Sequence, residues 1–140
     1  MDFTFNEEQS LIQGQVEQFI QRDYDWETRQ SFISSDLGFS SDNWKTFAEL
    51  GWLGISLSEE SGGFGGTSID TMIVMEEFGK VCASTTLSYL AHSMLCVNNI
   101  DKNASKQQKE KFLPKLISGE HIGCMGMSEP EYGSDALGMQ

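Results

Sequence analysis

The sequence predicts an all-α fold for most of its 140 residues. Two capping pairs, Asn6 with Gln9 and Ser105 with Gln108, place a side-chain acceptor at a helix start and a polar partner three residues later. Apolar residues recur every three or four positions in several segments, and glycines follow at points where helices usually end. A chain of this length buries about two-thirds of its unfolded surface, so one helical domain is predicted.

The first predicted helix begins at Asn6. Its apolar residues fall at i, i+4, i+7 and i+8, so they form one stripe that can dock on neighbouring helices. That stripe consists of Ile12, Val16, Phe19 and Ile20. Between Tyr24 and Phe39 the apolar pattern weakens, and a shorter helix followed by a loop is expected there.

A capped helix is predicted from about Ser40 to just before Gly51. Gly51 can adopt a positive φ at little cost. Trp52 would then fold back on Phe47, which is the apolar contact that often accompanies a glycine-terminated helix. The stretch 52–58 is expected to be an extended connector.

The glycine-rich segment 61–66 suggests either a tight loop or a phosphate cradle. It lacks the lysine followed by Ser or Thr of a P-loop, and no parallel strand precedes it. The glycines are therefore interpreted as a tight loop that lets two helices approach each other. A further helix is predicted from Thr67 or Ser68 to Gly79.

The cleanest amphipathic signal in the chain lies in the next helical segment. Its apolar stripe consists of Leu87, Leu90, Ala91, Met94 and Leu95. His92 lies beside this stripe and belongs to no catalytic constellation. It is interpreted as a histidine at a packed or partly wet helix edge, not as a general base.

The last predicted helix runs from Ser105 to Leu113, where Pro114 is expected to kink or end it. A short turn closed by Gly119 follows. Beyond Gly119 the apolar spacing suggests a short strand, and the segment 128–135 is a turn rich in Pro and Gly. The strand is predicted at Ile122, Cys124 and Met127.

The composition excludes several classes of function. Twenty-one acidic against nine basic residues give a net charge of −12, which disfavours binding to nucleic acid. No apolar run approaches the length of a membrane span. No secretory signal is evident, so a cytoplasmic location is expected. Cys82, Cys96 and Cys124 are interpreted as buried thiols, and with two histidines they complete no metal site.

Six segments in order resemble the acyl-CoA dehydrogenase family. They are FTFNEEQ, WKTFAELGWLGI, ESGGFGG, MEEFGK, KEKFLPKLISGE and MSEPEYGSD. The most specific sign of this family is LPKLISGE followed, within the length of a strand, by SEP and then GSD. The stretch RDYDWETRQ, with SIDTMIVMEEFGK, is most similar to the small subunit of pimeloyl-CoA dehydrogenases and their steroid-degrading relatives.

The resemblance implies that residues 1–120 form the family's amino-terminal helical domain. Residues 121–140 would then begin a truncated middle β domain, and the carboxy-terminal helical bundle would lie outside the chain. The family's catalytic carboxylate lies in that bundle, so no catalytic residue is assigned here. The resemblance also implies FAD as cofactor, an acyl-CoA substrate, an electron-transfer flavoprotein or similar acceptor, and a homo- or hetero-tetramer.

The resemblance also assigns a flavin-binding segment. Residues expected to contact FAD are Met125, Gly126, Met127, Ser128, Gly133 and Ser134. Ser128 matches a position that hydrogen-bonds the polar edge of the flavin ring, and Ser134 one that meets the acyl-CoA thioester. Glu131 and Tyr132 depart from the family pattern, in which a small residue usually follows the proline.

The leading hypothesis is that the intact protein catalyses α,β-dehydrogenation of an acyl-CoA, with this chain an inactive fragment. The alternative is a non-catalytic helical partner subunit of an acyl-CoA dehydrogenase complex. An acyl-CoA oxidase or flavin monooxygenase of the same fold is a third option.

Overall fold

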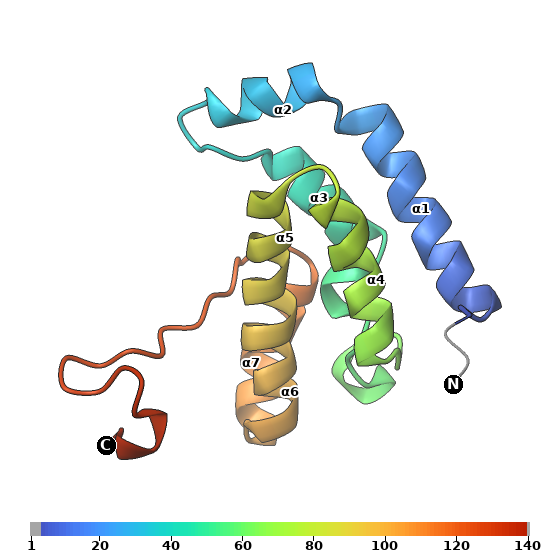
Figure 1. Ribbon diagram of the computed structural model, residues 1–140. Helices are drawn as coiled ribbons and strands as arrows, with labels where there is room; N and C mark the ends of the chain where they lie inside the picture. Colours follow the sequence, from blue (N-terminus) through green and yellow to red (C-terminus); the bar gives the residue numbers. More distant parts are fainter. Residues whose placement is uncertain (1–3, 140) are drawn as a thin grey trace.

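The computed structural model describes residues 4–139, and its regular structure is helical throughout that range (Figure 1). The all-α prediction is therefore confirmed; Phe3, which opens the FTFNEEQ segment, lies outside the described residues. The α-helices are α1 (Glu7–Asp23), α2 (Trp26–Ile33), α3 (Ser41–Glu49), α4 (Ser68–Gly79), α5 (Ala83–Tyr89), α6 (Asn98–Asn103) and α7 (Lys106–Ile117). Shorter elements are η1 (Trp52–Gly54), η2 (Glu59–Ser61), the π-helical η3 (Leu90–Val97) and η4 (Ala136–Gly138).

The helix starts follow the predicted caps. Asn6 and Ser105 each form a capping box with the residue three positions later, and Thr67 does the same with Asp70 at the start of α4. Ser40 caps α3 by accepting a hydrogen bond from the Asn43 amide. Local polar side chains therefore suffice to place these helix starts, because each one satisfies an otherwise unpaired backbone N–H.

An aromatic cluster forms the main core between α1, α3 and α4. Gly51 adopts φ of 79° after α3, and Trp52 folds back on Phe47 with their ring centroids 5.4 Å apart, as predicted. Phe78 of α4 is fully buried and lies 4.9 Å from Phe47 and 6.0 Å from Phe19 of α1. Such tilted and edge-to-face pairs stabilise the fold beyond simple burial of apolar area.

The prediction of an extended connector at 52–58 is wrong. This stretch is coiled into η1 and tight turns, because burying Trp52, Leu53 and Leu57 requires it to stay within the core. The glycine-rich loop packs directly on it: a Cβ at Gly63 would lie 2.4 Å from the Leu57 Cβ, and the Gly65 amide donates to the Leu57 carbonyl at 2.7 Å. The glycines thus allow a loop, not two helices, to approach closely.

The long apolar stripe does not face the core. Helix α5 continues into η3 and α6 as one rod (Figure 1). The buried residues of this rod are Tyr89, His92, Ser93 and Val97. Leu87 and Leu95 of the predicted stripe are instead 62% and 42% exposed. The π-helical turns change which residues share a face. The Tyr89 hydroxyl also donates to the Trp52 carbonyl at 2.8 Å, so this buried polar group has a hydrogen-bond partner.

Helix α7 does not end at Pro114, so of the two predicted outcomes, a kink or an end, the end is wrong. It continues through the proline to Ile117. Leu113 and Leu116 lie on the buried face, where they pack with Leu57 and Val97 in a second apolar cluster. Burial of Leu116 requires the last turn to stay helical, so packing outweighs the hydrogen bond that the proline removes.

The strand predicted at Ile122, Cys124 and Met127 is absent from the described residues. Instead, the chain beyond α7 runs away from the helices as a tail (Figure 1). A strand needs a partner to pair its backbone groups, and no other described segment lies in position to supply one. The cysteines also differ from expectation: Cys82 and Cys96 are only partly buried, and Cys124 is exposed. None of the helices described is long and apolar enough to cross a membrane.

Candidate functional site

The chain leaves the helical body at a tightly fixed point after α7. Gly119 has φ of 74°, and the amide of His121 donates to the Lys115 carbonyl at 2.9 Å. Two residues later the amide of the buried Gly123 donates to Nδ1 of His92 at 2.9 Å. A Cβ at Gly123 would lie 2.6 Å from the Cys96 Sγ, so only glycine fits at this crossing.

His92 is fully buried, so of the two expected settings, packed or partly wet, the packed one holds. Its ring meets Trp44 edge-on, with centroids 5.0 Å apart. Burial lowers the pKa of His92 to about 4, against a smaller opposing effect of the Leu116 carbonyl. The ring is therefore neutral at pH 7. Because its Nδ1 accepts the Gly123 amide, the remaining ring proton lies on Nε2.

The predicted flavin-binding residues lie in the tail just beyond this crossing. Met125 and Met127 are 41% and 49% exposed, and Ser128 and Ser134 are exposed as well. The structure keeps these residues together in one segment. Neither serine lines the cavity between α2, α3 and α5 or the groove beside the glycine-rich loop, which are described below. Their flavin and thioester roles remain predictions.

A local turn shapes the centre of the tail. Glu129 and Tyr132 exchange two backbone hydrogen bonds, of 2.8 and 3.2 Å. Tyr132 also lies against Gly138, where a Cβ would come within 2.7 Å of its ring. The Glu129 amide is used within this turn, whereas the amides of Met127 and Ser128 lie outside helix and sheet and stay available to an external acceptor.

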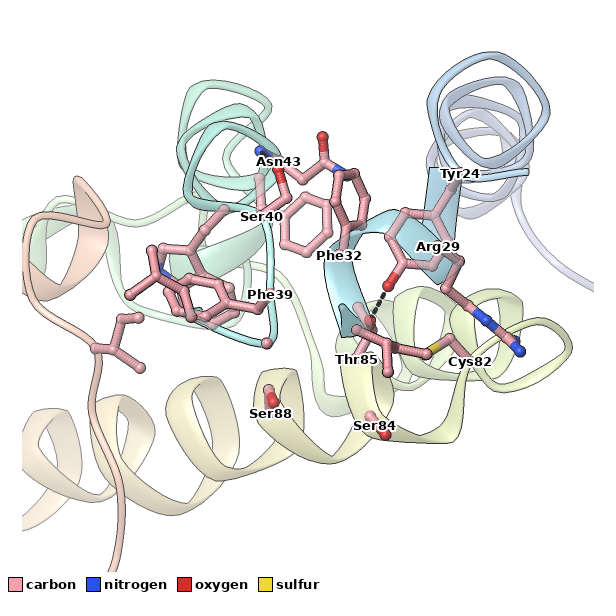
Figure 2. A pocket seen from close by; sticks show the side chains of 16 residues that line it. Tyr24, Arg29, Phe32, Phe39, Ser40, Asn43, Cys82, Ser84, Thr85 and Ser88 are labelled. Atoms are coloured by element: carbon pink, nitrogen blue, oxygen red, sulfur yellow. Dashed lines mark hydrogen bonds between the residues drawn. The ribbon is translucent and has the colours of Figure 1, made fainter. Parts of the chain in front are cut away.

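A cavity of about 400 Å³ lies between α2, the loop that follows it, α3 and α5 (Figure 2). Phe32 and Phe39 line one wall, and Ser84 and Ser88 project from α5 on the other. Tyr24 and Thr85 share a hydrogen bond of 2.5 Å at its edge. The lining contains no Asp or Glu, so this cavity offers an apolar space with hydroxyl groups and no carboxylate base. Sequence reasoning missed it, because its walls come from segments far apart in the chain.

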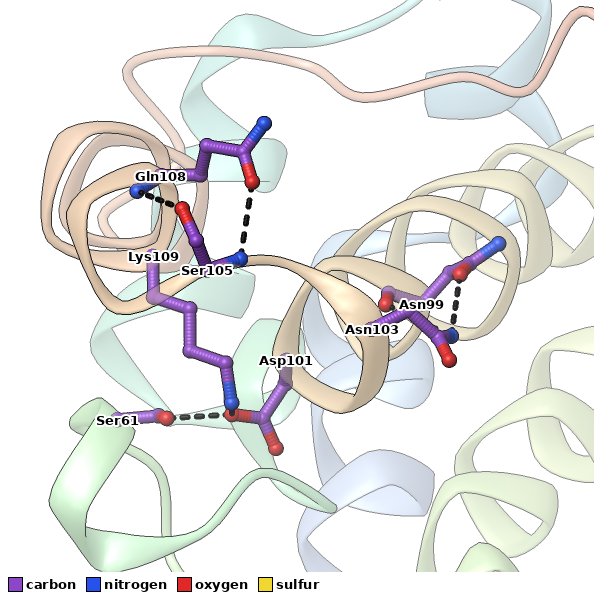
Figure 3. Close-up of polar contacts among 7 residues, drawn as sticks. All are labelled: Ser61, Asn99, Asp101, Asn103, Ser105, Gln108 and Lys109. Carbon is purple, nitrogen blue, oxygen red and sulfur yellow. Dashed lines mark hydrogen bonds and ion pairs between the residues drawn. The ribbon is translucent and has the colours of Figure 1, made fainter.

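A second, more polar groove lies beside the glycine-rich loop. Ser61 of this loop hydrogen-bonds Asp101 of α6, and Lys109 of α7 lies 3.5 Å from the same carboxylate (Figure 3). The lysine is therefore paired within the protein, and the loop is tied to the helices behind it. This arrangement agrees with the structural interpretation of the glycines in preference to a phosphate cradle. In the described part of the chain no cluster of three or more His, Cys, Asp or Glu could hold a metal ion.

Comparison with known proteins gives a consistent family match. The model for "Acyl-CoA dehydrogenase, N-terminal domain" matches residues 6–120. Mitochondrial isovaleryl-CoA dehydrogenase from Bos taurus is 42% identical over 135 residues, which are 96% of this chain and 32% of that protein. The crystal structure of an acyl-CoA dehydrogenase complexed with FAD from Bacillus anthracis superposes with a TM-score of 0.84 at 29% identity, covering 97% of this chain and 23% of that chain.

A structure described as the electron transferring flavoprotein of Acidaminococcus fermentans matches with a TM-score of 0.84 at 28% identity, over all of this chain and 36% of that chain. This chain spans about a third of the length of the curated relatives it matches. The similarity to isovaleryl-CoA dehydrogenases corrects the finer placement drawn from RDYDWETRQ, which pointed to small subunits of pimeloyl-CoA dehydrogenases.

Proposed function

Because this chain belongs to the acyl-CoA dehydrogenase family, we propose that the full-length protein catalyses α,β-dehydrogenation of an acyl-CoA thioester with FAD. The observation that carries the proposal is the family match over residues 6–120, with the same helical arrangement as a dehydrogenase bound to FAD. The chain itself supplies the helical domain and the tail. The base that removes the α proton comes from the rest of the protein.

The tail fits the proposed cofactor. The Met127 and Ser128 amides are free of helix and sheet, and the Ser128 hydroxyl is exposed, so these groups can donate hydrogen bonds to the edge of a flavin ring. FAD, when bound, would supply the hydride acceptor for the oxidation of the acyl chain. Ser128 and its neighbours, Met125–Met127 and Gly133, would hold the ring, and Ser134 would orient the thioester. Fixed donors of this kind favour the negative charge that develops during the reaction.

The substrate is proposed to be a short, branched acyl-CoA. This rests on the similarity to isovaleryl-CoA dehydrogenases, whose named substrate carries a branched acyl group. The apolar stripe gives the full-length protein an apolar surface against which an acyl chain or its other domains can pack. That stripe consists of Leu87, Leu90, Ala91, Met94 and Leu95. We further propose an electron-transfer flavoprotein or similar acceptor, a tetrameric assembly and a cytoplasmic location.

Flavin binding by two protein lengths tests this proposal. The 140-residue chain and the full-length protein are purified, mixed with FAD and desalted, and their visible absorption is recorded. The full-length protein is expected to retain flavin and to oxidise isovaleryl-CoA with an artificial electron acceptor, whereas the short chain retains no stoichiometric flavin. A full-length protein without flavin, or a short chain that holds it, would contradict the proposal.

Two serine variants of the full-length protein sharpen the test. Ser128→Ala is expected to weaken flavin binding, and Ser134→Ala to raise KM for the acyl-CoA, because each loses a side-chain donor. Ser118→Ala is the matched control, since Ser118 is an exposed serine at the end of α7. If all three variants had the same flavin affinity and the same KM, the roles assigned to Ser128 and Ser134 would be wrong.

The alternative of a non-catalytic partner subunit is favoured by one observation: Leu87 and Leu95 of the stripe are exposed, and another protein could cover them. The size of the native protein separates the two. A native protein of about 140 residues that copurifies with a dehydrogenase would support the partner subunit, and one about three times longer would support the enzyme.

A further inference from the structure

The crossing at Gly123 is the last point at which the described tail is anchored to the helical body. Gly123 is buried between the side chains of His92, Cys96 and Leu116, and Met125 lies only two residues further on. Beyond it, the backbone hydrogen bonds found in the tail are local to the tail. The position of Gly123 therefore sets where the tail begins.

The side chain that holds Gly123 is itself rigidly placed. His92 has no solvent exposure, and its ring stands perpendicular to Trp44, with an interplanar angle of 89°. It lies in the π-helical segment η3, whose altered turn brings it inward in place of the apolar stripe. Segments of π-helix recur at functional sites. A buried histidine on such a segment, with its acceptor atom on a backbone amide, is a precise anchor.

We infer that His92 is a positioning residue: by accepting the Gly123 amide, it sets the place from which Met125–Ser134 reaches the flavin and the thioester. The inference rests on the proposed function. Ser128 is five residues from Gly123, which is at most about 18 Å of extended chain. A displacement of Gly123 therefore also displaces the flavin-binding segment, because only a few residues between them can adjust. Small misplacements of this kind can cost up to about 100-fold in rate.

Substitutions at position 92 in the full-length protein test this inference. His92→Leu removes the acceptor and keeps an apolar side chain. His92→Asn keeps an acceptor, because the Asn Oδ1 atom occupies the place of the histidine Nδ1. Ser93→Ala is the matched control: Ser93 is also buried in η3, but its hydroxyl faces the Leu53 carbonyl and not the crossing. For each variant, kcat per bound flavin, KM for isovaleryl-CoA, the flavin absorption spectrum and thermal unfolding are measured.

The expected result is a fall of about 10- to 100-fold in kcat per bound flavin for His92→Leu, with a shifted flavin spectrum and a raised KM, because Ser134 belongs to the displaced segment. His92→Asn should restore most of the rate, and Ser93→Ala should leave it unchanged. If His92→Leu fails to fold, the asparagine variant decides: a rate near wild type supports the inference and an impaired rate overturns it.

Two other outcomes overturn the inference. One is a wild-type rate per bound flavin in folded His92→Leu, which would show that the crossing does not position the site. The other is an equal loss in the leucine and asparagine variants, which would show that the acceptor is irrelevant. In both cases an active wild-type protein leaves the proposed function intact. A wild-type protein with neither flavin nor dehydrogenation removes the proposed function and this inference together.

Discussion

The helical body and the tail differ in where their side chains find partners. In the body, the buried carboxylate of Glu77 finds its partners within the same chain: it is 3% exposed, receives a hydrogen bond from Gln13 at 2.7 Å and pairs with Lys80 at 2.5 Å. In the tail, the residues assigned to cofactor and substrate are exposed. Stability and the proposed ligand contacts thus belong to separate regions, which meet at Gly123.

The largest effect is expected from the aromatic core. Phe78→Ala should lower the free energy of unfolding by about 3 to 5 kcal/mol, because it leaves a cavity among Phe19, Phe47 and Trp52. Phe112→Ala is the control, since Phe112 is 40% exposed on α7. Urea unfolding followed by circular dichroism measures both. Equal losses would show that the aromatic cluster is not the centre of the fold.

The next effect is a dependence of stability on pH that His92 causes. Its pKa is about 4 in the folded protein and 6.5 in a free side chain. Between these values the unfolded chain binds a proton that the folded protein does not, so stability falls as pH drops from about 6.5 to about 4. The total loss is roughly 3 kcal/mol.

Unfolding free energies at several pH values check this dependence. His92→Leu should flatten the slope in that window, and His121→Gln, which changes an exposed histidine, should leave it unchanged. An unaltered slope in His92→Leu would show that another group is responsible.

Two glycine substitutions should change the free energy of unfolding in opposite directions. Gly63→Ala is expected to cost about 1 to 3 kcal/mol, because the new Cβ meets Leu57 and the Gly54 carbonyl, at 2.4 and 2.6 Å. Gly14→Ala in α1 meets nothing within 4 Å and should stabilise the protein by about 0.5 to 1 kcal/mol. Thermal unfolding of the two variants measures this contrast. A harmless Gly63→Ala would mean that the loop does not pack on the connector.

The smallest effect is expected from removing the tail. A chain that ends at Cys124 should unfold within about 0.5 kcal/mol of the 140-residue chain, because the residues beyond it are mostly exposed. Shortening the chain further to Gly119 should destabilise it, since the Gly123 contacts with His92 and Cys96 are then lost. If removing residues 125–140 alone lowered the free energy of unfolding strongly, the tail would contribute to stability as the body does.

Much of the fold could be predicted from local signals. The Asn6 and Ser105 capping pairs act on the first turn of their own helices, so their effect does not depend on distant residues. The fold of Trp52 onto Phe47 likewise spans only one glycine turn. By contrast, the stripe from Leu87 to Leu95 assumes an α-helical period, whereas the π-helical turns from Leu90 place other residues on the buried face. Periodicity shows that a helix has an apolar face, but it does not show which partner that face meets.

The candidate site was predicted only in part, for a related reason. The segment Met125–Ser134 was recognised from its order of residues, yet nothing in that order shows that Gly123 is held by His92, 31 residues earlier. Local interactions therefore determined the helix starts and the glycine turn, and the order of the sequence motifs indicated the family. The burial of His92, the passage of α7 through Pro114 and the anchoring of the tail depend on contacts between distant segments. These contacts form only when the whole body packs, because burial energy belongs to the assembled core and not to any one segment.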